Sequence, residues 1–130
     1  MRMIYTAIIS PIEEGKGYLV RVPDLPGCIT TGRTLAEVLD NVRDALAVYL
    51  CSLEDTHDPF PTPRPPEAFS PKPGEACVLV DADTVKYRKE TDTRAVRKNV
   101  SIPAWMATMA EQRGVNCSQV LQDALRSMFA

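Results

Sequence analysis

Three polar side chains in the C-terminal part of the chain have the types and the spacing needed to read DNA bases. Arg97, Asn99 and Ser101 stand at every second position, and in a strand such residues project from one face. Arginine can bond guanine through two hydrogen bonds, asparagine can do the same with adenine, and serine can take either role. Residues 97–103 therefore predict a short strand whose polar face carries side chains able to bond base edges. The alternative is an ordinary solvated strand face.

Two helices are expected to position this strand. Pro103 suits the first position of a helix over residues 104–113, which Gly114 closes, and Asn116 or Ser118 caps a second helix. The second helix has a stripe at steps of three and four residues, formed by Cys117, Val120, Leu121, Ala124, Leu125 and Met128. A lone strand and two short helices cannot pair the strand or bury this stripe. We therefore expect an obligate dimer, in which a second copy supplies both.

The rest of the chain offers little catalytic chemistry. Asp24, Glu37 and Asp44 would bind Mg²⁺ only if the fold brought them together, and no spacing in the sequence requires that. His57, the only histidine, has no serine or cysteine partner near it in the sequence. The four cysteines are scattered, without a Cys-x-x-Cys pair, which argues against a thiolate metal site and favours reduced, mostly buried thiols. We expect no enzyme activity, no metal and no cofactor; residual Mg²⁺-dependent nuclease activity is the catalytic alternative.

Four extended segments predict the sheet of an N-terminal domain. Residues 3–10 are rich in β-branched side chains, residues 18–22 alternate in polarity, and residues 28–31 are a further β-branched run. The first two of these are expected to form a hairpin. A short apolar run over residues 76–80 predicts a buried strand that returns to the same sheet.

One long amphipathic helix is expected to cover this sheet. Thr34 and Glu37 have the spacing of a capping box, so the helix should begin at Leu35. Its apolar stripe consists of Leu35, Val38, Leu39, Val42, Leu46 and Tyr49. The order of elements is then β-β-β-α-β, an α+β domain over residues 1–83.

A proline-rich loop and a polar linker complete the expected organisation. Residues 54–75 hold seven of the eleven prolines and cannot form a helix or a central strand. We place this loop within the first domain and expect Phe60 or Phe69 to anchor it. Residues 84–94 are polar and suit a linker, with the second domain over residues 95–130.

Charge is divided unevenly between the two parts. Residues 1–83 carry 7 basic and 13 acidic side chains, whereas residues 84–130 carry 8 basic and 4 acidic ones. The acidic part would attract a basic partner, and the basic part could meet phosphates. The sequence has neither a membrane-spanning run nor the pattern of a signal peptide, so a cytoplasmic protein is expected, with no membrane partner.

Residues 17–34 carry a family resemblance. They read Gly-Tyr-x-Val-x-Val-Pro-Asp-Leu-Pro-Gly-Cys-x-Thr-x-Gly-x-Thr, and Glu37, Asn41 and the pair Asp44 and Ala45 follow. This run resembles the HicB family of antitoxins. The resemblance implies a partial, degenerate ribonuclease-H-like domain that binds and masks a HicA-like toxin, a small basic ribonuclease with a double-stranded-RNA-binding type of fold.

The strand-helix-helix segment resembles the ribbon-helix-helix repressors, in which paired strands enter the DNA major groove. By that resemblance, Arg97, Asn99 and Ser101 occupy base-reading positions. Lys98 departs from the family, because it falls where an apolar residue is usual; its stem can snorkel and its ammonium can reach a phosphate. Backbone amides around Asn116, Cys117 and Ser118, at the start of the second helix, clamp a phosphate in such modules.

Acidic side chains are the candidates for toxin contact, on charge alone. They are Asp40, Asp44, Glu54, Asp55 and Asp58. The sequence and the two resemblances together predict an antitoxin that neutralises a HicA-like toxin and binds operator DNA as a homodimer or tetramer, to regulate its own operon. The alternative is a solitary transcription regulator whose first domain senses a ligand or only oligomerises.

Overall fold

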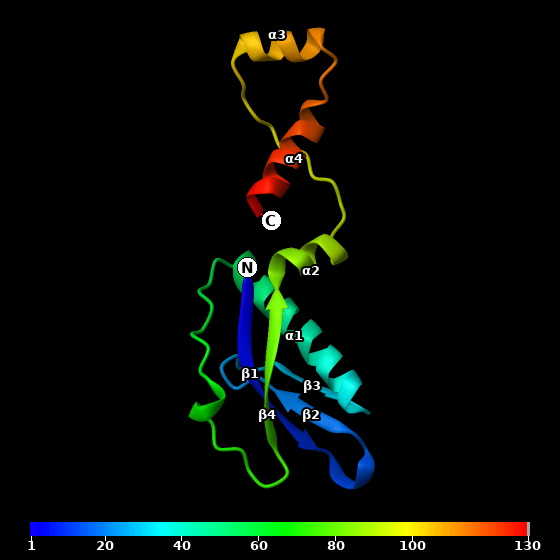
Figure 1. Cartoon of the computed structure of the whole chain (residues 1–130), viewed down its shortest axis with the longest axis vertical. Coiled ribbons are helices and arrows are strands. Elements are labelled where there is room, and N and C mark those ends of the chain that lie inside the picture. Colours follow the sequence, from blue (N-terminus) through cyan, green and yellow to red (C-terminus); the bar gives the residue numbers. More distant parts are fainter. Residues whose placement is uncertain (130) are drawn as a thin grey trace. The chain divides into compact units, whose positions relative to one another are not determined.

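The computed structural model describes residues 1–129 and divides the chain into two units, Met1–Asp92 and the residues from Thr93 onward. The first unit combines a sheet with helices, and the second contains two helices (Figure 1). The α+β class expected from the sequence is confirmed. Among the described helices, none is both long and apolar enough to cross a bilayer.

The sheet of the first unit is antiparallel and has the order β3-β2-β1-β4. Its strands are β1 (Arg2–Pro11), β2 (Tyr18–Arg21), β3 (Ile29–Gly32) and β4 (Ala76–Asp83). β1 lies inside the sheet because it pairs with β2 on one side and with β4 on the other (Figure 1). The expected hairpin and the return of the fourth strand are confirmed, and β3 and β4 are the edges.

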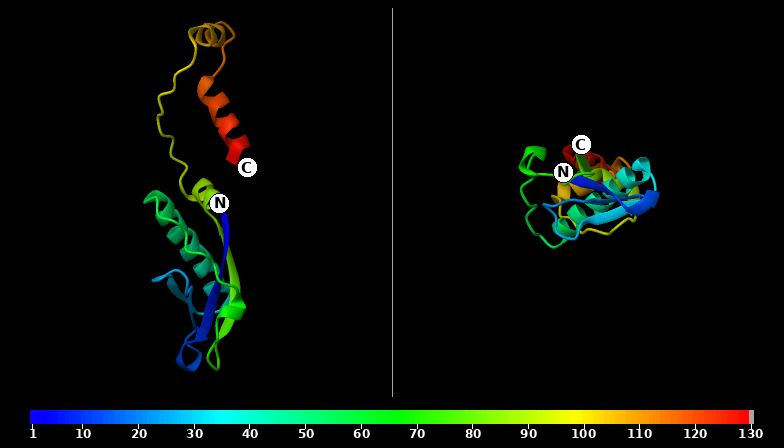
Figure 2. Two further views of the ribbon diagram at one scale, coloured as in Figure 1. Left: turned by 90° about the vertical axis from the view of Figure 1, so that its left-hand side faces the viewer. Right: turned by 90° about the horizontal axis from the view of Figure 1, so that it is seen from below.

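Helix α1 (Leu35–Asp55) covers one face of this sheet (Figure 2). It begins where the capping box predicts, and the Glu37 amide donates a 3.1 Å hydrogen bond to Thr34 Oγ1. Its buried residues are Val38, Val42, Leu46, Ala47, Leu50 and Cys51. The expectation that Leu35 and Leu39 belong to the core is wrong, because they are 52% and 37% exposed. Burial instead extends to Ala47 and Cys51, on the part of α1 that α2 approaches.

The core of the first unit lies between α1 and the sheet. It is formed by Tyr5, Ala7, Ile9, Val20, Val22, Leu25, Cys28, Val38, Val42, Leu46, Ala47, Leu50, Val80 and Ala82. Leu46 and Leu50 have no exposed surface, and full burial of a leucine side chain contributes about 1.5–3 kcal/mol. The helix and the sheet therefore depend on each other for stability.

Two glycines of the family motif allow a close approach of backbone segments. A Cβ on Gly17, whose φ is +111°, would lie 2.4 Å from the Gly32 carbonyl oxygen. A Cβ on Gly32 would lie 2.5 Å from the Val38 amide nitrogen. Both glycines are required because backbone atoms occupy the space that a side chain would need.

The proline-rich loop is fixed to the first unit, as expected. Tyr5 Oη donates a 2.6 Å hydrogen bond to the Pro61 carbonyl, and Thr6 Oγ1 donates a 3.0 Å bond to the Arg64 carbonyl. Phe60 packs against the core, and the Arg64 guanidinium lies 4.5 Å above the ring of Phe69. Both phenylalanines thus hold the loop, which contains one short 3₁₀ turn, η2 (Pro66–Ala68).

The segment expected as a linker, residues 84–94, is mostly helical. α2 (Thr84–Thr91) begins directly after β4 and belongs to the first unit. Asp83 caps it, accepting hydrogen bonds from the amides of Val85 and Lys86. The sequence pattern failed to predict this helix because it has no sustained apolar face, and its position depends on Asp83 and on contacts with α1.

The second unit contains α3 (Ala104–Gln112) and α4 (Cys117–Phe129), close to the predicted bounds. Gly114 ends the first of these helices with a φ of +63°. Residues 97–103 do not form a strand, which corrects that expectation. A strand needs hydrogen-bond partners on a neighbouring strand, and none of the described strands pairs with this segment. Among the described residues of this unit, Ala110 is half-buried and all the others are exposed.

All four cysteines are free thiols. Cys28 and Cys51 are buried, and that burial raises the pKa of both thiols. Cys77 is half-buried and Cys117 is exposed at the start of α4. The expectation of mostly buried thiols thus holds for the first unit and not for Cys117.

Candidate functional site

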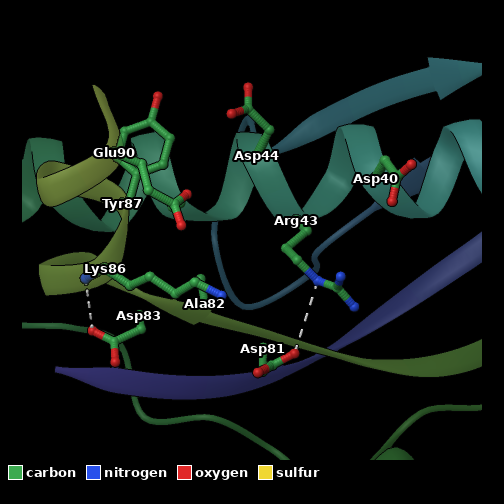
Figure 3. A pocket seen from close by; sticks show the side chains of 10 residues that line it. Asp40, Arg43, Asp44, Asp81, Ala82, Asp83, Lys86, Tyr87 and Glu90 are labelled. Atoms are coloured by element: carbon green, nitrogen blue, oxygen red, sulfur yellow. Dashed lines mark hydrogen bonds and ion pairs between the residues drawn. The ribbon is translucent and has the colours of Figure 1, made fainter. Parts of the chain in front are cut away.

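An acidic groove lies between α1, β4 and α2 in the first unit (Figure 3). Its volume is about 270 Å³, and it is lined by Asp40, Arg43, Asp44, Ala47, Asp81, Ala82, Asp83, Lys86, Tyr87 and Glu90. Five carboxylates and two cationic side chains give this lining a formal charge of −3. Ala47 and Ala82 are buried and Tyr87 is half-buried, so the groove has an apolar floor below its charged walls.

Part of this negative charge is neutralised within the chain. Asp81 forms ion pairs with Arg2, at 3.2 Å, and with Arg43, at 3.9 Å. The carboxylates of Asp40, Asp44 and Glu90, in contrast, are exposed and form no hydrogen bond or ion pair with any described residue. These three carboxylates will be called the free rim.

Asp83 has a structural role at the end of the groove. Its Oδ1 accepts hydrogen bonds from the amides of Val85, at 3.0 Å, and Lys86, at 3.3 Å, and lies 3.5 Å from the Met1 ammonium. The bond from the Lys86 amide, followed by the charge of the ammonium, lowers the pKa of Asp83 below its usual value. Asp83 therefore remains charged and holds the first turn of α2.

Glu54 and Asp55 share a single arginine as their ion-pair partner. Arg88 Nη2 lies 3.2 Å from Glu54 Oε1 and 2.9 Å from Asp55 Oδ1, and it also donates to the Cys51 carbonyl at 3.1 Å. The hydrogen bond to Asp55, followed by that to Glu54, raises the pKa of Arg88. This cluster fixes α2 to the C-terminal end of α1, which makes it a structural clamp.

The structure thus separates the five acidic residues suggested for toxin contact. Asp40 and Asp44 lie in the groove, Glu54 and Asp55 lie in the clamp, and Asp58 accepts a 2.7 Å bond from Thr56 in the turn after α1. The sequence reasoning missed the groove residues Asp81, Asp83 and Glu90. The alternation of acidic residues at the end of the fourth strand was the signal for the first two.

Asp24 supports the loop and lies apart from the other carboxylates once considered for Mg²⁺. Its side chain is 6% exposed and accepts bonds from the Arg64 amide, at 2.8 Å, and from Arg64 Nε, at 2.6 Å. In the described part of the chain, no three histidine, cysteine or acidic side chains gather where they could hold a metal ion. His57 is exposed in the turn after α1, with a φ of 58°.

The candidate DNA-binding residues all lie exposed in the second unit. Arg97, Lys98, Asn99 and Ser101 are in the extended segment before α3, and Asn116, Cys117 and Ser118 are at the start of α4. Asn116 caps α4, because its Oδ1 accepts a 3.1 Å hydrogen bond from the Gln119 amide. The apolar side chains of this unit are exposed as well, and Trp105, Val120 and Met128 are 62%, 56% and 75% exposed.

Comparison with known families gives a match over most of the chain. The family described as "HicB_like antitoxin of bacterial toxin-antitoxin system" matches residues 5–124. Antitoxin HicB 1 of Photorhabdus laumondii is 36% identical over 63 residues, which are 48% of this chain and 40% of that protein. The sequence likeness thus includes both units.

Solved structures of HicB antitoxins have a fold similar to that of this chain. The crystal structure of the antitoxin HicB of Burkholderia pseudomallei aligns with a TM-score of 0.56 at 26% identity, covering 95% of this chain and 96% of that chain. A chain from a "HicA3 and HicB3 toxin-antitoxin complex" aligns with a TM-score of 0.52 at 29% identity, covering 62% of this chain and 99% of that one.

Proposed function

Because this chain belongs to the HicB-like antitoxin family of bacterial toxin-antitoxin systems, we propose that it binds and neutralises a HicA-like toxin that cleaves mRNA. It acts by covering the toxin and not by catalysis. Its first unit makes the contact, and its second unit binds operator DNA as a dimer.

The observation that carries the first part is the acidic groove. An RNA-cleaving protein needs a basic surface to hold phosphates, and a basic surface is attracted to a groove whose lining has a net charge of −3. A related chain was solved in a complex named for HicA3 and HicB3, which supports a toxin as the partner. Among the five acidic candidates, Asp40 and Asp44 are the ones we retain for direct contact.

The second part of the proposal rests on the uncovered apolar surface of α3 and α4. Two short helices whose described residues bury almost nothing do not form a stable unit alone. A ribbon-helix-helix dimer covers the apolar residues of α4 and pairs residues 97–103 of the two copies. We therefore propose that Arg97, Asn99 and Ser101 contact bases, that Lys98 reaches a phosphate, and that Asn116, Cys117 and Ser118 hold a phosphate at the helix start.

The proposed domain plan follows from these roles. The first unit acts as a partial ribonuclease-H-like domain and the second as the dimerisation and DNA-binding module. Residues 92–103 join α2 to α3 without regular structure, so the flexible connection lies later than residues 84–94. Dimers of the second unit can associate further through an edge strand of the first unit, which would give a tetramer.

Co-purification tests the first part of the proposal. We expect the gene beside this one to encode a small basic protein. This chain, tagged, is co-expressed with that protein, and the mass of the isolated complex is measured. We expect a stable complex with equal numbers of the two chains. Recovery of this chain without its neighbour would contradict the antitoxin function and favour the solitary regulator.

Variants of the proposed ribbon test the second part. We expect Arg97→Ala and Asn99→Ala each to weaken binding to the operon's promoter DNA about 5- to 100-fold, the range for loss of one good base contact. Arg113→Ala, which removes the same charge from the end of α3, is the control and should have a much smaller effect. Equal losses in Arg97→Ala and Arg113→Ala would contradict base reading, and the charge alone would then explain binding.

A further inference from the structure

We infer that the toxin docks in the acidic groove beside β4, and that the groove receives an extended, positively charged segment of that protein. This inference deepens the proposed function and rests on it. It adds the extended form of the bound segment and its place along β4, neither of which follows from family membership.

The first observation is an unpaired strand edge that forms one border of the groove. β4 extends over Ala76–Asp83 and pairs only with β1 among the described strands. Its outer backbone amides and carbonyls are therefore open to another strand. An extended peptide that adds to such an edge gains main-chain hydrogen bonds along its length. The border of the groove thus favours a strand-like occupant.

The second observation is the apolar floor beneath the charged walls. Ala47 and Ala82 are each 5% exposed, and with the half-buried Tyr87 they give the groove between α1, β4 and α2 a floor of small and aromatic surface. Long cationic side chains pack their aliphatic stems on such surface and keep the charged end in water. The floor therefore accepts lysine or arginine better than a short acidic side chain.

The third observation is the free rim, which decides the sign of the occupant's charge. Asp40, Asp44 and Glu90 project around the groove and have no partner among the described residues, whereas Asp81 and Asp83 are already paired (Figure 3). A cationic segment could form ion pairs with all three of these carboxylates. A second copy of this chain would bring an identical acidic edge against this one, and like charges repel. Charge complementarity thus selects a basic partner over self-association.

A double charge reversal tests this surface. Asp40→Lys with Asp44→Lys reverses two free rim residues that have no contacts to lose, so folding should be preserved. Glu13→Lys with Glu67→Lys changes the net charge equally at two exposed positions that do not line the groove, and serves as the matched control. Thermal unfolding of both proteins confirms the fold before binding is measured. The binding partner is the small basic protein encoded beside this chain.

We expect the Asp40→Lys, Asp44→Lys protein to bind that partner about 10- to 100-fold more weakly than the control double variant, mainly through slower association. Its affinity should also depend less on salt concentration. Affinities within about threefold of each other would overturn the inference while leaving the proposed function intact. Absence of binding by the unmodified chain would overturn both.

Photo-crosslinking identifies the occupant directly. A photoreactive amino acid replaces Asp44 in one protein and Glu67 in a control, and each is irradiated in the full complex. Crosslinks to the toxin from position 44 and none from position 67 are expected. Crosslinks from position 44 to a second copy of this chain would overturn the inference, because the groove would then be a contact between copies.

Discussion

The pair formed by Asp24 and Arg64 allows the attachment of the proline-rich loop to be tested by a single substitution. Asp24 is nearly buried and accepts two hydrogen bonds from Arg64, one from the backbone amide and one from Nε. Asp24→Ala removes both bonds, and water cannot easily replace the carboxylate at this place. The loop should separate from the corner between β2 and β3, and the first unit should lose stability.

The size of the loss follows from the two bonds. A hydrogen bond to a charged group contributes about 1.5–3 kcal/mol, which applies to the bond from the Arg64 amide. The Arg64 side chain is 54% exposed, so its ion pair is screened and contributes about 0.2–1 kcal/mol. Asp24→Ala should therefore lower the free energy of unfolding by about 2–4 kcal/mol. Arg64→Ala keeps the amide and should cost less than Asp24→Ala.

Urea unfolding followed by far-UV circular dichroism measures these losses, because α1 and α2 supply much of the helical signal of the first unit. Glu67→Ala, an exposed change in the same loop, is the control and should stay within about 0.5 kcal/mol of the unmodified chain. Equal stability of Asp24→Ala and Glu67→Ala would contradict the role of Asp24 in attaching the loop. A larger loss of unfolding free energy in Arg64→Ala than in Asp24→Ala would contradict it as well.

Three further predictions concern packing, pH and assembly. Gly32→Ala should lower stability by about 1–3 kcal/mol, because a Cβ at 32 meets the backbone of Val38, whereas Arg33→Ala, at the exposed position beside it, should change stability by no more than about 0.5 kcal/mol; thermal unfolding compares the two. The pKa of Asp83 is lower in the folded chain than in the unfolded chain. Its carboxylate therefore stabilises the fold when the pH is above the pKa of the unfolded chain, and this stabilisation is lost as the pH falls below about 4. The melting temperature of Asp83→Asn should thus be lower than that of the unmodified chain at neutral pH and approach it in acid. Leu125→Glu places a charge on the apolar surface of α4 that the proposed dimer covers, so light scattering should show monomers. A dimer retained by this variant would contradict the proposed role of α4 in dimerisation.

The sequence predicted the elements whose signals are local. The capping box at Thr34 and Glu37 gave the start of α1 to the residue, and the apolar run at 76–80 correctly predicted a return to the sheet. The turn at Gly114 likewise ended α3 as expected. Each of these signals lies within a few consecutive residues, which is why it can be read from one sequence.

Features that depend on distant contacts could not be predicted in this way. α2 has no apolar face, and Arg88 fixes it to residues more than thirty positions earlier in the chain. The acidic candidates could be found by charge, but charge does not distinguish a carboxylate neutralised by an arginine from a free one. Tertiary structure separates Asp55 in the clamp from Asp44 on the free rim. The strand proposed for residues 97–103 would pair with a second copy of the chain, a contact that one sequence does not reveal.

The most direct test of the central claim is an RNA-cleavage titration. The small basic protein encoded beside this chain is incubated with an mRNA substrate, and increasing amounts of this chain are added. The proposed function predicts that cleavage falls to zero once one copy of this chain is present for each copy of the toxin. Undiminished cleavage in the presence of excess folded chain would contradict the claim that this protein is the antitoxin of its neighbour.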